Sequence, residues 1–253
     1  MTKNLSFALF LTVLVAMTSG PAFALVGASA PGGALASAVV MVLNRWAGGA
    51  GFCSGIVIAR DVILTAAHCT AAPRDMRIHF RDESGKPVLM DIEASAVHPL
   101  YRAEAQKTRQ RSIDLALLRT ALPLPGRFRA VTLDNRAAIT AGSRLRVAGF
   151  GVTREGAGTS AGELRVGLLE ARAPLSSILL SAGDPAHAGT GACSGDSGGP
   201  IFAATSDIVV AVVDWATGTG PRHCGDVTQA ALVAPQRGWI ASVLRGWGVK
   251  NPT

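Results

Sequence analysis

The chain alternates short apolar runs with turn-forming residues over most of its length. Runs rich in Val, Ile, Leu and Phe lie at 39–43, 55–59, 62–64, 76–80, 115–118, 144–147, 164–169, 201–202 and 208–213. Short runs of this composition, separated by residues such as Gly, Asp and Asn, predict β-strands. Because turn signals are frequent and helical patterns do not alternate with the runs, the sequence predicts an all-β sandwich or barrel rather than βαβ units.

The last part of the chain has a different period. Trp239, Ile240, Val243, Leu244 and Trp247 recur at three- and four-residue spacings, which place side chains on one face of a helix. We therefore expect an amphipathic helix close to the C-terminus.

A break in the strand pattern lies between Arg119 and Arg136. Its sequence ALPLPGRF, residues 121–128, contains two prolines and one glycine, which suits a connection rather than a strand. We expect it to divide the chain into two β-rich halves, residues 25–130 and 131–253, that together form one domain.

The first 24 residues have the features of a secretory signal peptide. Lys3 is their one charge, Leu5–Met17 is mostly apolar, and Ala22-Phe23-Ala24 fits a small-x-small cleavage site. The apolar run is short for a membrane span, so an uncleaved anchor is the less favoured alternative. We expect a mature chain of residues 25–253, secreted to the periplasm or the extracellular medium without a stable membrane anchor.

The charge pattern does not indicate a nucleic-acid-binding protein. The formal net charge is +7 at pH 7, but the basic residues are scattered, and the densest patch, Lys107–Arg111, is short. No nucleic-acid-binding motif is present in the sequence. We therefore expect an ordinary solvated surface.

The chain has four cysteines, Cys53, Cys69, Cys193 and Cys224. An even number after a signal peptide predicts disulfides formed in an oxidising compartment, with three possible pairings. A metal site is the alternative, because His68 and His223 each precede a cysteine. Since the spacings match no common zinc framework, we expect no metal and no other cofactor.

Ser197 lies in the unusual segment Gly195-Asp196-Ser197-Gly198-Gly199-Pro200. Glycines permit positive φ and close backbone approach, so this segment can hold a hydroxyl on a tight turn beside exposed amide N–H groups. A turn between two strands is the simpler interpretation. A serine hydroxyl becomes a strong nucleophile when a nearby base removes its proton.

His68 and Asp114 are the candidates for the base and its partner. His68 follows the apolar run 62–64 in LTAAHC, and Asp114 precedes the apolar run of DLALL. A carboxylate at this position is costly to bury unless it accepts a hydrogen bond, and an imidazole N–H would supply one while fixing the histidine tautomer. Each residue alone could instead be a core histidine or a turn-capping aspartate.

Together, LTAAHC, DLALL and GDSGGP, with LVG at residues 25–27, resemble the trypsin/chymotrypsin-like serine proteases over residues 25–253. The resemblance implies one peptidase domain of two perpendicular six-stranded antiparallel β-barrels, with a catalytic cleft between them. It implies Ser197 as acylating nucleophile, His68 as general base and then general acid, and Asp114 as the group that orients His68. The N–H groups of Gly195 and Ser197 would form the oxyanion hole.

The resemblance also implies structural pairs. Cys53 would be bonded to Cys69, and Cys193 to Cys224. The α-amino group of Leu25, released by cleavage, would insert beside the serine loop and form an ion pair with Asp196. Because Leu25 follows the expected signal cleavage site directly, we expect signal peptidase itself to create the activating terminus.

The substrate pocket departs from the family pattern. Trypsin-like members have an aspartate six residues before the serine, where this chain has Gly191. Asp226 either projects into the pocket from the opposite wall or is a surface turn residue. The family usually has Ser-Trp-Gly where this chain has Asp214-Trp215-Ala216. An ionised Asp214 cannot donate a hydrogen bond to Asp114. Asp214 is therefore protonated, or it is turned away from Asp114, or the family's serine corresponds to a neighbouring position of this chain.

These features predict a secreted, monomeric serine endopeptidase that acts on protein or peptide substrates. A catalytically weak or inactive homologue that acts as a binding module is the alternative, supported by Asp214 and Ala216. An esterase on the same scaffold is a third possibility, because acyl transfer to water uses the same groups.

Overall fold

A computed structural model of the protein describes residues 25–108, 110–134, 136 and 139–249. The expected signal peptide, residues 1–24, lies outside the described residues. None of the described helices is both long enough and apolar enough to cross a bilayer.

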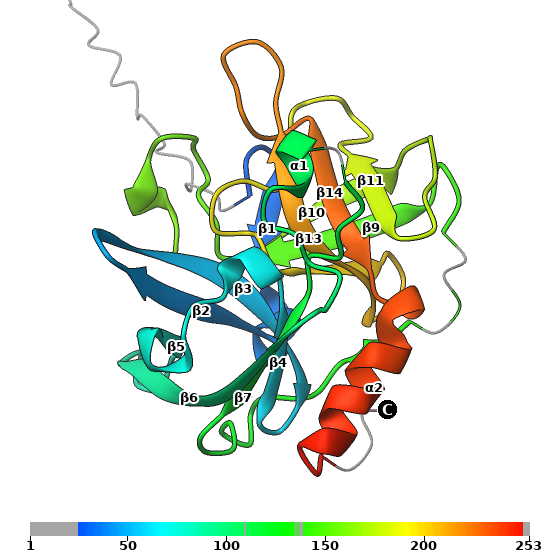
Figure 1. Ribbon diagram of the computed structural model, residues 1–253. Helices are drawn as coiled ribbons and strands as arrows, with labels where there is room; N and C mark the ends of the chain where they lie inside the picture. The colour runs from blue at the N-terminus through cyan, green and yellow to red at the C-terminus, as the bar shows by residue number, and fades with distance from the viewer. Residues whose placement is uncertain (1–24, 109, 135, 137–138, 250–253) are drawn as a thin grey trace, which may run out of the picture.

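The first half of the chain forms a closed antiparallel barrel of six strands. They are β2 (Val39–Trp46), β3 (Gly49–Ala59), β4 (Val62–Thr65), β5 (Met76–Arg81), β6 (Pro87–Val97) and β7 (Ala116–Thr120), in the order β2-β3-β4-β7-β6-β5. Strand β5 illustrates the sequence logic, because Met76, Ile78 and Phe80 are buried and alternate with less buried polar residues. This barrel lies at the lower left of Figure 1.

The second half forms another closed six-stranded barrel. Its strands are β9 (Arg144–Gly149), β10 (Arg165–Ala171), β11 (Leu179–Gly183), β12 (Pro200–Ala203), β13 (Ile208–Thr217) and β14 (Val227–Leu232). They are neighbours in the order β10-β11-β14-β13-β12-β9, and pairing of β9 with β10 closes the barrel. The short β8 (Thr132–Leu133) runs parallel to β13. The predicted all-β, two-barrel fold is confirmed.

The start of the described chain belongs to the second barrel, although it precedes the first in sequence. Strand β1 (Ser29–Pro31) pairs antiparallel with β10, as Figure 1 shows. The Leu25 side chain is fully buried in the core of that barrel with Leu145 and Val147. The expected boundary near residue 130 remains a prediction, but residues 25–31 pack with the half that follows it.

The helical elements are short. They comprise α1 (Ala105–Thr108), α2 (Arg237–Gly246) and five 3₁₀ turns: η1 (Gly33–Ser37), η2 (Ala67–Cys69), η3 (Pro73–Asp75), η4 (Gly158–Ser160) and η5 (Ala234–Gln236). Helix α2 is the predicted amphipathic helix: Ile240 and Leu244 are buried, and Trp239 and Val243 pack beside them.

One hydrophobic core joins the two barrels and α2. It includes Ile58 and Leu115 from the first half, Phe202 and Val212 from the second, and Leu244 from α2. Because close-packed interiors deform little, this shared core fixes the position of one barrel relative to the other.

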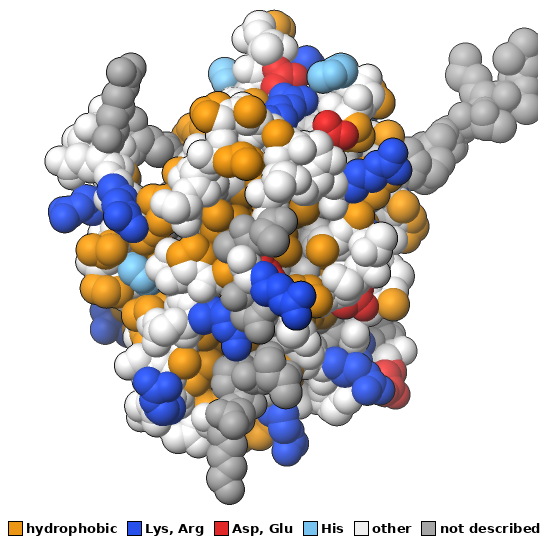
Figure 2. Space-filling model, turned by 90° about the vertical axis from the view of Figure 1, so that its right-hand side faces the viewer, with side chains coloured by type: hydrophobic (Ala, Val, Ile, Leu, Met, Phe, Trp, Pro, Cys, Tyr) orange, Lys and Arg blue, Asp and Glu red, His pale blue; other side chains and the backbone are white. Residues whose placement is uncertain are grey.

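Charged side chains are dispersed on the surface. On the face drawn in Figure 2, Lys and Arg side chains are separated by apolar and uncharged ones and form no continuous stripe.

Candidate active site

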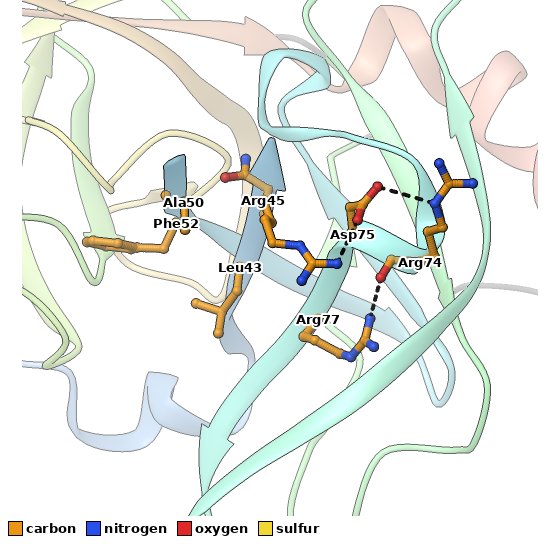
Figure 3. A pocket seen from close by; sticks show the side chains of 9 residues that line it. Leu43, Arg45, Ala50, Phe52, Arg74, Asp75 and Arg77 are labelled. Atoms are coloured by element: carbon orange, nitrogen blue, oxygen red, sulfur yellow. Dashed lines mark hydrogen bonds and ion pairs between the residues drawn. The ribbon is translucent and has the colours of Figure 1, made fainter. Parts of the chain in front are cut away.

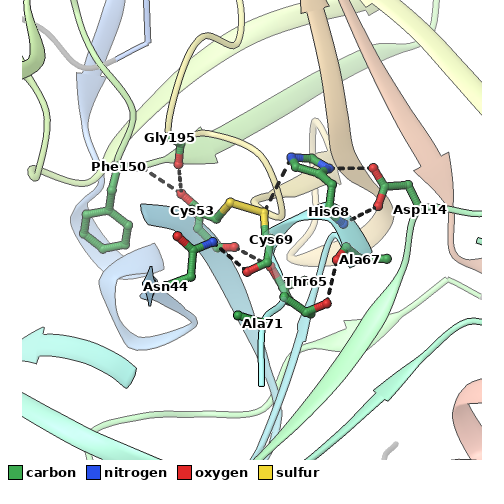
Figure 4. Close-up of a disulfide and its surroundings, with 12 residues drawn as sticks. Asn44, Cys53, Thr65, Ala67, His68, Cys69, Ala71, Asp114, Phe150 and Gly195 are labelled. Carbon is green, nitrogen blue, oxygen red and sulfur yellow. Dashed lines mark hydrogen bonds and ion pairs between the residues drawn. A yellow bond between two sulfur atoms is a disulfide. The ribbon is translucent and has the colours of Figure 1, made fainter. Parts of the chain in front are cut away.

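His68 is held where β4 ends. The four residues of β4 are all buried, and the chain then turns through η2, where Ala67 and Cys69 are buried but His68 is exposed. A disulfide joins Cys69 to Cys53 on β3, and the side-chain amide of Asn44 donates a hydrogen bond to the Cys69 carbonyl oxygen at 2.9 Å. The turn that presents His68 is therefore fixed on both sides (Figure 4).

Asp114 contacts His68 through both carboxylate oxygens. His68 Nδ1 lies 2.6 Å from Oδ2, and the His68 main-chain N–H donates to Oδ1 at 2.9 Å. Asp114 can adopt this position because Ile113 and Leu115 on either side are fully buried. An N–H at Nδ1 leaves the lone pair of His68 at Nε2, which is the arrangement that a general base requires.

Electrostatics favour the protonated form of His68. Burial of the ring acts to lower its pKa, but the hydrogen bond from His68 to Asp114 and the negative charges of Asp114 and Asp214 outweigh it. The pKa of His68 is therefore raised above its usual range. An imidazolium formed during a reaction would be stabilised by the same charges.

The Ser197 loop reaches the first barrel next to the His68 turn. The Ser197 carbonyl oxygen accepts the N–H of Ser54 at 2.8 Å. A Cβ on Gly198 would collide with Thr65 and with the Ser54 carbonyl oxygen, so this position requires glycine. Within the described part of the chain, the Ser197 hydroxyl makes no hydrogen bond, and His68 Nε2 lies 3.7 Å from Cys69 Sγ. The serine and histidine loops are brought together, but the link between their side chains is not closed.

The turn before Ser197 leaves two N–H groups free. Gly195 has φ +96°, and a Cβ there would collide with the Phe52 ring. The Gly195 carbonyl oxygen accepts a hydrogen bond from the Ser54 hydroxyl at 2.9 Å, which fixes the peptide bond that follows Gly195. Among the described residues, no acceptor binds the N–H of Gly195 or of Ser197. Two unpaired donors at a glycine turn are suited to stabilising a developing oxyanion.

Asp196 is fully buried behind this turn. Its carboxylate accepts the N–H groups of Gly151 at 2.8 Å and Cys193 at 3.0 Å. Burial raises the pKa of Asp196 to about 7, even though these two donors act to lower it. No cation pairs with this carboxylate in the described part of the chain.

Leu25, the expected partner of Asp196, lies in the same region but is bonded to the preceding residue in this full-length chain. The main chain next to it is already docked: the Val26 carbonyl oxygen accepts the Gly191 N–H at 3.1 Å. Ala28 N–H donates to the Thr190 hydroxyl at 3.0 Å. The ion pair between Leu25 and Asp196 therefore remains a prediction about the cleaved chain.

The expected substrate-pocket residues lie on two facing segments. On β13 and β14, Ala216 pairs with Thr228, and the Asp226 N–H donates to the Thr217 carbonyl oxygen at 2.9 Å. A Cβ on Gly191 would lie 3.2 Å from Thr228 Oγ1. The disulfide Cys193–Cys224 ties the two segments together, and the Trp215 side chain on β13 is 48% exposed.

Asp214 is buried beside the catalytic residues. It lies at a bulge in β13, where the register with β14 shifts between Val213 and Trp215. Gln229 donates to its Oδ2 at 3.4 Å, whereas the buried Oδ1 has no hydrogen-bond partner. Burial, followed by the charge of Asp114, raises the pKa of Asp214 to about 7. Of the alternatives from sequence, the structure therefore favours a buried Asp214 that can hold a proton.

Ser54 is a site residue that sequence reasoning missed. It is fully buried, and its hydroxyl donates to the Gly195 carbonyl oxygen while accepting the Phe150 N–H at 3.0 Å. Ser54 thus connects the first barrel to the turn before Ser197 in the second. The available signal was a serine directly after Cys53 within an otherwise apolar strand.

Two further features do not add a metal or a strong anion site. The ligand atoms of Cys53, His68 and Cys69 lie within 4.8 Å of one another, but the disulfide leaves neither sulfur as a thiolate.

A cavity of about 480 Å³ lies on the first barrel beside Phe52 (Figure 3). Its three arginines are paired with carboxylates, Arg45 and Arg74 with Asp75 and Arg77 with Asp91.

Comparison with known proteins identifies the family. The model of the Trypsin family matches residues 26–240. The chain belongs to the trypsin family of serine proteases. Membership identifies it as a serine-type endopeptidase, and the residues that matched the family by resemblance are those found at the barrel junction.

Sequence alignments with two relatives extend over most of the chain. It is 31% identical to a vitellin-degrading protease of Bombyx mori, over 76% of this chain and 76% of that protein. It is 28% identical to granzyme M of Rattus norvegicus, over 77% and 80% of the two chains. The trypsin family acts on proteins or peptides, so substrates of this class are expected here.

Solved structures show the same fold. Mouse neuropsin superposes with a TM-score of 0.64 at 19% identity, over 81% of this chain and 93% of that one. Human heparin binding protein gives a TM-score of 0.71 at 22% identity, over 90% and 99%. These comparisons show the fold alone, which is that of the two barrels and the C-terminal helix drawn in Figure 1.

Proposed function

We propose that the protein is a secreted endopeptidase that cleaves peptide bonds through an acyl-enzyme on Ser197. The observation that carries this proposal is the pair of contacts between His68 and Asp114, 2.6 Å and 2.9 Å long. They orient the ring and direct Nε2 away from the carboxylate. A structural histidine would not require this orientation next to a glycine-rich serine turn.

In the proposed reaction, Ser197 Oγ attacks the carbonyl carbon of the scissile bond as its proton moves to His68 Nε2. Asp114 stabilises the imidazolium, and the free N–H groups of Gly195 and Ser197 bind the oxyanion. Collapse breaks the C–N bond, and His68 protonates the leaving amine. A water molecule then repeats the sequence on the acyl-enzyme and releases the acid.

The reaction requires the Ser197 side chain to approach His68 Nε2. The unbound protein does not form this hydrogen bond, as often holds before substrate binds. The peptide bond between Ser197 and Gly198 is fixed on both edges: the Ser197 carbonyl oxygen accepts the Ser54 N–H at 2.8 Å, and the Gly198 N–H donates to the Val213 carbonyl oxygen at 2.7 Å. A rotation about the Ser197 side chain is therefore the movement that we expect substrate to select.

We further propose that cleavage after Ala24 activates the enzyme. The released Leu25 amino group would supply the cation that Asp196 lacks and would lock the oxyanion turn. Secretion, cleavage by signal peptidase and a monomeric state are part of this proposal. N-terminal sequencing of secreted protein should give Leu25, whereas a longer mature form with a second cut would contradict it.

A covalent label tests the catalytic proposal directly. Protein secreted from the full-length chain should react with a phosphonyl or sulfonyl fluoride, and the Ser197→Ala variant should not. Failure of folded wild-type protein to react would instead favour the binding module, the alternative that Asp214 and Ala216 support. Hydrolysis of ester but not peptide substrates would indicate an esterase.

A further inference from the structure

Arg222 forms an ion pair with Asp226, one of the expected substrate-pocket residues. Its Nη2 atom lies 3.2 Å from Asp226 Oδ1 and 3.1 Å from Thr219 Oγ1. Arg222 and Asp226 flank Cys224, whose disulfide to Cys193 holds this loop against the segment leading to Ser197. The ion pair is therefore anchored at the pocket rather than on a remote surface.

The opposite wall has space for the arginine because it lacks a side chain. Gly189 has φ +85°, and a Cβ there would lie 2.5 Å from Arg222 Nη1. The guanidinium thus extends from the loop before Cys224 across to the segment that contains Gly191. Gly191 itself carries no charge where trypsin-like members have an aspartate.

The carboxylate of Asp226 is only partly satisfied. Oδ1 contacts Arg222, whereas Oδ2 is buried and has no hydrogen-bond partner in the described chain. The nearby Arg172 donates to the Asp226 carbonyl oxygen at 2.9 Å and thus fixes the main chain. A buried oxygen without a donor is destabilising, so this carboxylate retains capacity for another cationic donor.

We propose that Arg222 is an internal occupant of the substrate pocket, which holds the Asp226 carboxylate in the free enzyme and is displaced by a basic substrate side chain. The inference rests on the proposed function, because it concerns the same cleft. Asp226 supplies the negative charge that Gly191 does not. Arg222 determines how readily that charge is available, and is therefore a specificity-determining residue.

Displacement is feasible because the internal ion pair is weak. The side chain of Arg222 is 48% exposed and that of Asp226 22%, and a single nitrogen makes the contact. Exposed pairs of this kind contribute little stabilisation. An amidinium or guanidinium that reaches both carboxylate oxygens would form the stronger bidentate arrangement.

The test uses benzamidine, an aromatic amidinium, as a probe of the pocket. Its affinity is measured by calorimetry with secreted protein in which Ser197→Ala removes catalysis. Adding Arg222→Ala should tighten binding by roughly threefold to fivefold at low salt. The gain should shrink at about 1 M salt, where exposed ion pairs are screened. Arg222→Gln, which keeps a donor for Thr219 but removes the charge, should act in the same direction.

Matched variants separate this effect from others. Arg245→Ala on α2 removes an exposed arginine outside the pocket and should not change binding. Asp226→Asn should weaken binding and abolish the gain from Arg222→Ala. The proposal would be overturned if Arg222→Ala left the benzamidine affinity unchanged, or if no variant bound benzamidine. It would also be overturned if Arg222→Ala tightened binding equally when Asp226→Asn was present.

The same design distinguishes failure of the pocket inference from failure of the proposed function. Tighter benzamidine binding to Arg222→Ala in a protein that cleaves no peptide would support the pocket assignment and contradict the protease assignment. In active protein, Arg222→Ala should lower KM for substrates with Arg or Lys before the scissile bond and leave kcat unchanged. Peptide cleavage without these changes would leave the proposed function standing and reject the role of Arg222.

Discussion

One carboxylate, that of Asp114, accepts two hydrogen bonds from a single residue, His68. Oδ2 lies 2.6 Å from the ring Nδ1 atom, and Oδ1 accepts the main-chain N–H at 2.9 Å. The ring and its backbone are therefore oriented together, and the tautomer follows from this orientation.

Asp114→Asn should disable catalysis with little effect on folding. The asparagine oxygen can keep the main-chain contact, but its NH₂ group then faces Nδ1 and favours the tautomer with a proton at Nε2. We expect kcat to fall by about 10⁴-fold, the size of this effect in trypsin-like enzymes rather than a value derived from these distances. Steady-state kinetics would measure it, and near-normal kcat would contradict the assigned role.

Asp214 should make stability depend on pH. Its pKa is raised from 3.8 to about 7, so the folded state binds the proton more firmly than the unfolded state. The resulting stabilisation is full below about pH 4 and is lost as pH rises through about 7. The free energy of unfolding of Asp214→Asn minus that of wild type should therefore be larger at pH 8 than at pH 5, by on the order of 2 kcal/mol.

Thermal melting of both proteins at the two pH values would measure this difference. Asp207→Asn is a suitable control because that aspartate is largely exposed and pairs with Arg146. A pH-independent difference between wild type and Asp214→Asn would show that Asp214 titrates normally in the folded protein.

A chain extended before Leu25 should be poorly active. Without a free amino group, Asp196 remains an unpaired buried carboxylate, and the oxyanion turn is not locked. We expect kcat/KM to be roughly 10²-fold lower than for protein that begins at Leu25, comparable to loss of one oxyanion donor. Steady-state kinetics of the two forms at equal protein concentration would measure it, and equal kcat/KM would argue against the ion pair.

Activity of the form beginning at Leu25 should also decline at alkaline pH. The proposed pairing with Asp196 would raise the pKa of the amino group above its unfolded value of about 7.7–8.0. Its contribution is present below that range and is lost as pH rises through the folded-state value. A rate profile from pH 7 to 11 would test this, and a flat alkaline limb would count against the pair.

Ser54→Ala should weaken both stability and catalysis. It leaves the partly buried Phe150 N–H without its acceptor and frees the Gly195 carbonyl, at a cost of about 1 kcal/mol. We expect a lower melting temperature and a lower kcat, measured on the same preparation. Ser84→Ala on the exposed turn between β5 and β6 is the control and should change neither.

The sequence predicted the parts of the fold in which apolar residues cluster. Strands such as β4 and β13 and helix α2 were predicted because their residues are buried. Strand β6 was missed because Ile92 is its one buried residue and the others are exposed or only partly buried. Strand β14 was missed because its middle residues are Thr, Gln and Ala, which give no clear strand pattern in the sequence. Their extended conformation follows from pairing with β11 and β13.

The candidate site shows a similar division. His68, Asp114 and Ser197 stand in recognisable local patterns, so the sequence could single them out. The sequence did not predict the contact of Ser54 with Gly195 or that of Arg222 with Asp226. The first contact depends on how two distant segments meet in space, and the second depends on the conformation of the loop around Cys224; the sequence pattern specifies neither.

The hydrophobic core shared by the two barrels has a consequence for the cell that makes this protein. His68 and Asp114 are presented by one barrel and Ser197 by the other, and the barrels are aligned through that common interior. A half-folded molecule therefore keeps nucleophile and base apart. The cell therefore obtains a complete candidate site only from molecules in which both barrels are folded and packed against each other.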